Sequence, residues 1–192
     1  MEFDCYIDFT CGYSYRAWLW FERLRNAGTD LVISWRSFVL KEVNRGEDAP
    51  SLLSGPTIES VAVLALAVAK ALPDDASAAV YRSRVFDAMH AREERATRDD
   101  VIHIATAVGL DADSFWADET LWLAEVRNEH MEAVQRHGVF GTPTLVFDDD
   151  ASMYLKLTDL PSENDIDLWD SVTTIVRSFP EVAELKRPSF SR

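Results

Sequence analysis

The stretch that decides the fold is GVFGTPTLVF, residues 138–147. Its end, Thr144–Phe147, is β-prone, and Pro143 stands immediately before it. Because proline has no backbone N–H, it belongs at the start or the edge of a strand, where its peptide bond can be cis. An acidic turn at 148–150 and a second β-prone run at 153–157 follow. The segment is therefore predicted to form a β-hairpin.

The N-terminal segment has the pattern of a β-α-β unit. In residues 2–9 the odd positions 3–9 are apolar and the even ones are mostly acidic, as in a half-buried strand. Residues 13–27 then have helical spacing, with Gly28 as the C-terminal cap. The run 30–40 is rich in Val, Ile, Trp and Phe and is predicted to be a second strand. Such a unit normally contains two parallel strands with a right-handed crossover.

The region between these segments is predicted to be helical. Residues 43–56 are polar and form a loop, and helices are expected at 57–72, 77–94, 99–108 and 119–137, with a short turn at 111–117. This divides the chain into one domain of residues 1–56 and 138–192 and an inserted all-helical subdomain of residues 57–137.

A last helix is expected after residue 161. We expect Ser162 to cap it, with Asp165 three residues on. Its inward stripe is predicted to comprise Ile166, Trp169, Val172, Val176 and Phe179.

Composition excludes several classes of protein. The chain has 192 residues with 19 basic and 33 acidic side chains, so its formal net charge is −14. This charge argues against nucleic-acid and anionic-membrane partners. No signal-peptide pattern is visible, and the longest apolar run, Val61–Ala71, is too short to span a bilayer. With only two cysteines and no paired histidines, neither a disulfide framework nor a metal site is predicted. We expect a soluble, cytoplasmic protein.

Cys11 is the strongest candidate for chemistry. It follows the first strand and precedes a helix, where the helix dipole and free backbone N–H groups stabilise a thiolate. Ser14, three residues on, is placed to donate its hydroxyl to the sulfur. The alternatives are a small buried apolar cysteine and, for Pro143, an ordinary strand-starting proline.

Taken together, these elements resemble the thioredoxin fold. A cysteine at a strand-to-helix turn and Thr-Pro before a hairpin, with helices inserted between them, are similar to the DsbA-like branch. That branch also contains the 2-hydroxychromene-2-carboxylate isomerases and the kappa-class glutathione transferases. The resemblance is carried by residues 8–17, 35–38 and 138–147, and it implies an α/β thioredoxin-like fold with a helical insertion.

The resemblance also implies roles for individual residues. Cys11 corresponds to the nucleophilic first cysteine of the C-x-x-C motif, and Pro143 to the cis-proline that faces it. Thr142 lends backbone groups to an incoming thiol or peptide. Asp8 is a candidate for tuning the thiol or relaying protons, and the alternative is a solvated or capping carboxylate.

The chain departs from the C-x-x-C pattern at two positions. Ser14 replaces the second cysteine, and Gly12 stands where proline is common. Cys5 cannot easily act as the resolving thiol, because six residues of strand place it about 20 Å away. We therefore expect a monothiol oxidoreductase acting on a small-molecule thiol or a protein disulfide. Glutathione or mycothiol would be its co-substrate, with no tightly bound cofactor.

Two other functions are open. The isomerases and transferases typically carry serine at the nucleophilic position and bind glutathione beside it. The second hypothesis is therefore an isomerase or transferase in which Cys11 and Ser14 orient the sulfur of glutathione or mycothiol. A degenerate, non-catalytic binding module is the third hypothesis. The relatives favour a homodimer. The candidate substrate-binding residues are Gly12, Tyr13 and Trp18, for an aromatic ligand, and Arg36 or Lys41, for the carboxylates of a small thiol.

Overall fold

The computed structural model describes residues 1–92, 94–148, 150–161 and 163–187. Its four-stranded sheet has the order β2-β1-β3-β4. The strands are β1 (Glu2–Ile7), β2 (Val32–Ser37), β3 (Thr144–Phe147) and β4 (Ser152–Tyr154). β1 is parallel to β2 and antiparallel to β3, and β3 and β4 form the hairpin. The predicted parallel pair and hairpin are confirmed, although β4 ends at Tyr154 rather than at 157.

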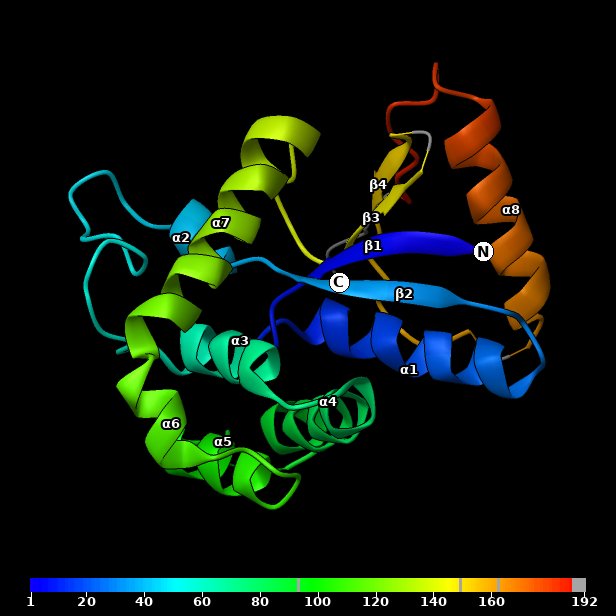
Figure 1. Ribbon diagram of the computed structural model, residues 1–192. Coiled ribbons are helices and arrows are strands. Elements are labelled where there is room, and N and C mark those ends of the chain that lie inside the picture. The colour runs from blue at the N-terminus through cyan, green and yellow to red at the C-terminus, as the bar shows by residue number, and fades with distance from the viewer. Residues whose placement is uncertain (93, 149, 162, 188–192) are drawn as a thin grey trace.

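Helices cover both faces of this sheet (Figure 1). On one face lie α1 (Gly12–Asn26) and α8 (Asp165–Ser178), whose Phe21 and Trp169 pack against Phe3 of β1. On the other face lies α7 (Glu119–His137), whose Ala133 shares a buried cluster with Tyr6 of β1. α1 ends as its sequence predicts, with Gly28 at φ +92° just beyond it, a conformation that glycine adopts without strain.

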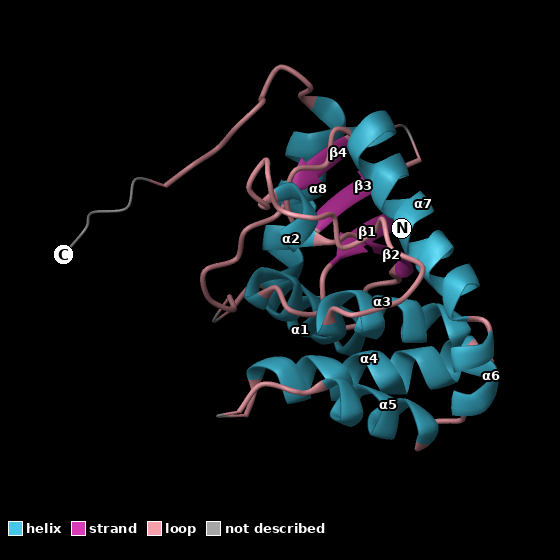
Figure 2. Ribbon diagram, turned by 90° about the vertical axis from the view of Figure 1, so that its left-hand side faces the viewer, coloured by secondary structure: helices cyan, strands magenta, loops and turns pink. Residues whose placement is uncertain are grey.

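The remaining helices are α2 (Leu40–Val43), α3 (Val61–Ala71), α4 (Asp75–His90), α5 (Arg98–Thr106) and α6 (Ala112–Ala117). α4, α5 and α6 lie together beyond the sheet in Figure 2. α3 packs against α4, α5 and α7, and this central position explains why residues 62–68 are all apolar and all buried.

One expectation for this region was wrong. Residues 112–117 form a helix rather than a turn, because the Asp111 carboxylate caps the first turn by accepting from Ser114 N.

The sheet and the inserted helices share one hydrophobic core. Phe9, just beyond β1, packs against Tyr81 and Phe86 of α4, at ring-centroid distances of 5.9 and 4.9 Å. The division into domains of residues 1–56 with 138–192 and of residues 57–137 stays a prediction.

The last helix corrects the predicted cap and part of the predicted stripe. It begins at Asp165 with Asn164 at the N-cap, whereas the expected cap, Ser162, lies outside the described residues. Trp169 is buried, but Ile166 and Phe179 are 43% and 51% exposed. The inward face instead runs through positions 165, 168, 169, 172, 173 and 176, so a residue at 166 or 179 points to solvent.

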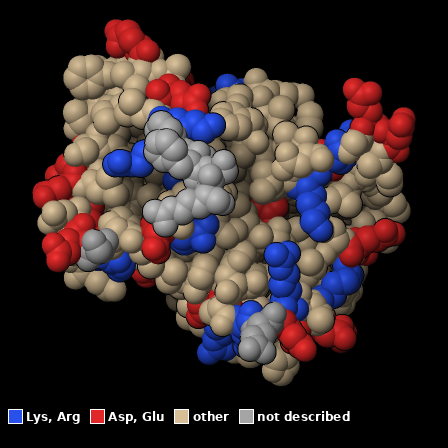
Figure 3. All heavy atoms as spheres, turned by 180° about the vertical axis from the view of Figure 1, so that it is seen from behind, with Lys and Arg blue, Asp and Glu red and all other residues tan. Residues whose placement is uncertain are grey.

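Charges of both signs are interspersed over the surface drawn in Figure 3, with acidic side chains mainly around its outline. Within the described ranges, no helix is both long and apolar enough to cross a bilayer.

Trp169→Ala should lower the free energy of unfolding by about 3–5 kcal/mol, because the indole packs against Phe3, Trp20 and Phe21. Urea unfolding followed by circular dichroism measures this difference. The matched control is Ile166→Ala on the same helix, with an expected change below about 1 kcal/mol. Equal effects of the two substitutions would contradict the packing of α8 on the sheet.

Candidate active site

The turn between β1 and α1 is organised by the fully buried carboxylate of Asp8. Its Oδ1 accepts hydrogen bonds from the N–H and the hydroxyl of Thr10, at 2.8 and 2.7 Å, and its Oδ2 accepts from Leu40 N at 2.9 Å. The backbone closes the same turn, with Cys11 N donating to Asp8 O at 3.0 Å. Asp8 thus holds the turn in shape and joins it to α2, which fits the capping alternative better than a proton relay.

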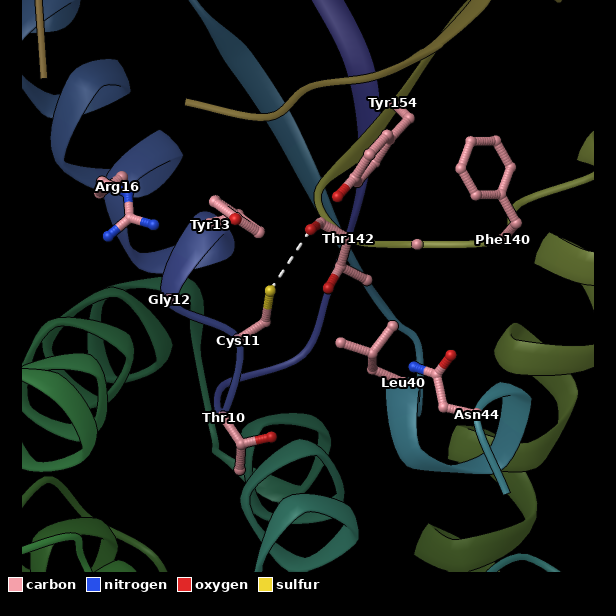
Figure 4. Close-up of a pocket in the computed structure, with 11 residues that line it drawn as sticks. Thr10, Cys11, Gly12, Tyr13, Arg16, Leu40, Asn44, Phe140, Thr142 and Tyr154 are labelled. Atoms are coloured by element: carbon pink, nitrogen blue, oxygen red, sulfur yellow. Dashed lines mark hydrogen bonds between the residues drawn. The ribbon is translucent and has the colours of Figure 1, made fainter. Parts of the chain in front are cut away.

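Cys11 occupies the N-cap position of α1, in an extended conformation with φ −89° and ψ 117°. The first turn of the helix contains no acidic residue, so its free N–H groups face no competing carboxylate. The side chain is 6% exposed and makes no capping hydrogen bond. Its Sγ–H donates instead to Thr142 O, at 3.4 Å (dashed line in Figure 4).

Thr142 belongs to the loop that leads into β3, and the Thr142–Pro143 peptide bond is cis. Thr144 Oγ1 donates to Gly141 O at 2.8 Å, and Leu155 N donates to Pro143 O at 2.9 Å. The register pairs Tyr6 of β1 with Thr144 of β3, so this loop lies just beyond the end of β1, beside the turn that carries Cys11. The structure therefore brings Cys11, Thr142 and Pro143 together.

A cavity of about 480 Å³ opens at Cys11, within the range of small-molecule sites. Its walls come from the β1–α1 turn, the first turns of α1, α2 with the residue that follows it, the cis-proline loop and β4 (Figure 4). They comprise Thr10, Cys11, Gly12, Tyr13, Arg16, Leu40, Asn44, Phe140, Gly141, Thr142 and Tyr154.

Tyr154 faces the sulfur from the hairpin. In Figure 4 its hydroxyl points toward Cys11 and the Thr142 carbonyl. Burial raises the pKa of Tyr154, so the phenol keeps its proton and can donate a hydrogen bond to a ligand. Gly141 leaves room for this ring, since a Cβ there would lie 3.1 Å from Tyr154 Cε2. The 65%-exposed Phe140 packs beside it, with ring centroids 5.2 Å apart.

Tyr13 and Arg16 form the other side of the cavity, and Lys156, which is not a lining residue, contacts the Tyr13 ring. Arg16 Cζ lies 4.9 Å and Lys156 Nζ 4.7 Å from the centroid of the Tyr13 ring. These are cation–π distances. Gly12 and Tyr13 are thus placed where a substrate of Cys11 would lie, as their candidate roles require.

Two other candidate residues, Arg36 and Trp18, lie elsewhere. Arg36 is on β2 and pairs with Asp4 and Glu129, at 3.3 and 3.4 Å, so its guanidinium does not line the cavity. Trp18 points from α1 into the core, where its ring packs against those of Tyr15 and Phe86, at centroid distances of 6.0 and 5.6 Å. Neither side chain lines the cavity at Cys11.

Ser14 is fully buried, does not line the cavity, and its Oγ has no hydrogen-bond partner among the described residues. Lys41 is exposed and also lies outside the cavity. The Ser14 hydroxyl therefore does not line the cavity beside Cys11.

Cys5 is unsuited to resolve a disulfide at Cys11. It is 0% exposed within β1, and burial raises the pKa of its thiol far above the ordinary value. Of the two cysteines in the chain, Cys11 is the one that lines the cavity. No group of three His, Cys, Asp or Glu side chains within the described ranges is arranged to hold a metal ion.

Several lining residues were not singled out by sequence reasoning: Thr10, Arg16, Leu40, Asn44, Phe140 and Tyr154. Arg16 was within the stretch that carries the resemblance, and its spacing of four from Gly12 places both on one face of α1. Thr10 and Phe140 also lie within those stretches. Leu40, Asn44 and Tyr154 gave no local signal, because folding brings them to Cys11 from separate segments.

These features define a thioredoxin-fold protein with one cysteine at the N-terminus of α1 opposite a cis-proline. The family model of the DSBA-like thioredoxin domain matches residues 2–162, so the chain belongs to that family. No curated protein sequence matches the chain significantly.

Solved structures with the same fold cover nearly the whole chain. A 2-hydroxychromene-2-carboxylate isomerase aligns with a TM-score of 0.64 and 19% identity, covering 97% of this chain and 100% of that one. A probable DsbA oxidoreductase from Streptomyces coelicolor aligns with a TM-score of 0.65 and 17% identity, covering 98% and 94%. A thioredoxin-like oxidoreductase from Silicibacter pomeroyi aligns with a TM-score of 0.58 and 19% identity, covering 90% and 84%.

Asp8→Ala should lower the free energy of unfolding by about 2–3 kcal/mol, because it leaves the N–H groups of Thr10 and Leu40 without their acceptor. Thermal or urea unfolding measures the loss. Asp48→Ala, in the exposed loop after α2, is the control and should change stability by less than about 0.5 kcal/mol. A fully stable Asp8→Ala protein would refute the bracing role of this carboxylate.

Proposed function

We propose that this protein catalyses thiol–disulfide exchange by a monothiol mechanism, with Cys11 as the nucleophile. The observation that carries the proposal is the position of Cys11 Sγ at the N-terminus of α1, 3.4 Å from Thr142 O, at a cavity that contains no second thiol. Membership of the DSBA-like thioredoxin domain family supports the same chemistry.

The reaction proceeds in two exchanges. The Cys11 thiolate attacks one sulfur of a disulfide R–S–S–R′, forming the Cys11–S–S–R bond and releasing R′–S⁻, which takes up a proton. A second thiolate, R″–S⁻, then attacks the R sulfur, forming R–S–S–R″ and returning Cys11 as a thiolate. Each step breaks one S–S bond and forms another, so the protein is neither oxidised nor reduced overall.

The surrounding residues assist each exchange in a different way. The free N–H groups of the first turn of α1 stabilise the Cys11 thiolate both before attack and as a leaving group. The Thr142 carbonyl, now occupied by the Cys11 thiol, becomes available to a substrate N–H once the thiol has lost its proton. The Tyr154 hydroxyl supplies a hydrogen bond to the departing sulfur.

The second thiol must come from solution, because Cys5 is sealed within the sheet. Glutathione and mycothiol are the co-substrate candidates, and the disulfide substrate is a small molecule or an exposed protein disulfide. We propose that this activity takes place in the cytoplasm, where small thiols are abundant and keep cysteines reduced.

A small-thiol-dependent isomerase is the second candidate. The 2-hydroxychromene-2-carboxylate isomerase structure aligns over its full length and over 97% of this chain, so neither protein has a large insertion relative to the other. The aromatic pair Phe140 and Tyr154 beside Cys11 also fits a ring-containing substrate. In this function Cys11 would orient the sulfur of the bound thiol without forming a disulfide.

Cys11→Ser should abolish exchange between a mixed disulfide and added thiol, reducing it to the uncatalysed rate, because serine cannot form the intermediate. Cys5→Ala is the matched control and should keep the activity, since Cys5 reaches neither substrate nor solvent. A coupled assay of glutathione disulfide formation measures both variants. Activity that persists in Cys11→Ser would reject the monothiol mechanism, and retained isomerisation in that variant would favour the second candidate.

A further inference from the structure

We propose that the cavity contains a subsite for a negatively charged group, formed by Arg16 and Lys156 around Tyr13, and that the substrate of Cys11 is a carboxylate-bearing thiol or disulfide. This inference rests on the proposed exchange function and adds the chemical class of its substrate.

The Arg16 side chain lines the cavity that opens at Cys11. Its Nε donates to Leu157 O at 2.7 Å, which anchors the side chain, while Nη1 and Nη2 each lie 3.9 Å from the point that a Gly12 Cβ would occupy. The free end of the guanidinium therefore lies over Gly12, the residue that follows Cys11 in the chain. In Figure 4 Arg16 and Tyr13 lie on one side of Cys11, and Phe140 and Tyr154 on the other.

Lys156 brings a second positive charge from the segment after β4. Its Nζ contacts the same Tyr13 ring, and its hydrogen bond with Tyr13 raises the pKa of the ammonium, which therefore stays charged at neutral pH. Two cations from distant parts of the chain thus converge on one cavity residue. An anion bound beside Tyr13 would gain from both charges, and a guanidinium also offers a fork of donors that matches a carboxylate.

No carboxylate of the described residues forms an ion pair with Arg16 or Lys156. Six other cations of the described residues form salt bridges: Arg23, Arg25, Arg36, Arg45, Lys70 and Arg136. Within the same ranges Arg16 and Lys156 form none, and none of the lining residues of the cavity is acidic. In a chain of net charge −14, two cations without acidic partners beside the nucleophile have their charge available to a ligand.

Neutral polar groups are available for the rest of the ligand. Thr142 is 1% exposed, and its Oγ1 has no partner among the described residues. Asn44 contributes a side-chain amide from the opposite wall. The cavity therefore offers hydrogen bonds to a polar molecule as well as charge to its carboxylate.

The net charge of the whole protein and the local charge of the cavity predict opposite preferences. With a charge of −14 the protein as a whole attracts cationic reagents and repels anionic ones. A preference for an anionic disulfide can therefore arise only from local groups that lie within about a Debye length of the sulfur.

The test uses three symmetric disulfides with the same two-carbon arms: dithiodipropionate (anionic), cystamine (cationic) and hydroxyethyl disulfide (neutral). The rate constant for mixed-disulfide formation at Cys11 is measured by intact mass in Cys5→Ala protein. Each value is divided by that of N-acetylcysteine amide, a thiol without a carboxylate, which removes differences in intrinsic reactivity. We expect dithiodipropionate to react about fivefold faster than the neutral disulfide and cystamine to react more slowly.

Variants assign this preference to the two cations. The ratio of anionic to neutral rate constants should fall about twofold to threefold in Lys156→Gln, whose side chain is exposed and not needed for folding, and about tenfold when Arg16→Gln is added. Arg16→Lys keeps the positive charge, so its ratio of anionic to neutral rate constants should stay close to that of the protein with Arg16. Arg136→Gln removes the same charge far from the cavity and should leave the ratio unchanged.

Each outcome decides between the proposals. An anionic rate no higher than the neutral one, or a preference that persists in the double variant, would overturn the anion subsite while exchange itself stands. Failure of all three disulfides to modify Cys11 in the folded protein would overturn the exchange function and the subsite with it.

Discussion

The position of β1 at the centre of the sheet determines what lies around Cys11. β1 is paired on both edges, in parallel with β2 and antiparallel with β3, so its register fixes which residues of both neighbours lie beyond its end. Tyr6 aligns with Thr144, which brings the cis Thr142–Pro143 peptide bond beside the turn that follows β1. The hydrogen bond from Cys11 to Thr142 O is a consequence of this register, and it joins residues 131 positions apart in the chain.

The turn is also held by contacts with α2 and α4. Asp8 ties it to Leu40 at the start of α2, and His90 of α4 lies with Nε2 2.8 Å from Phe9 O. Because a carbonyl can only accept, Nε2 carries the proton, and burial lowers the pKa of His90, which favours this neutral form. The inserted helices thus support the loop that carries Cys11, in addition to covering the core. A rigid turn keeps Cys11 at the N-cap of α1, where its thiolate gains most from the helix terminus.

Local sequence patterns were sufficient to predict the elements that carry the site. Alternation in residues 2–9, helical spacing in 13–27 and the Thr-Pro pair before the hairpin correctly predicted β1, α1 and the cis-proline loop. Arg36 was expected near the substrate, but it pairs with Asp4 and Glu129 instead. The sequence shows the charge of an arginine but not the partners that folding gives it. Tyr154 lines the cavity and Lys156 contacts Tyr13 only because the hairpin brings β4 back beside β3, a tertiary arrangement that no local period encodes. Ile166 was misassigned because the side of α8 that faces the core begins at positions 165 and 168 rather than at 166.

The central claim is that this fold activates Cys11, and the most direct test compares one thiol in two states of the same chain. The rate of alkylation of Cys11 by iodoacetamide at pH 7 is measured in Cys5→Ala protein, first folded and then unfolded in urea. Burial alone would slow the reaction in the folded state, since Cys11 is 6% exposed there. The account predicts faster alkylation in the folded protein, because the helix terminus stabilises the reactive thiolate. An equal or slower rate in the folded protein would contradict it.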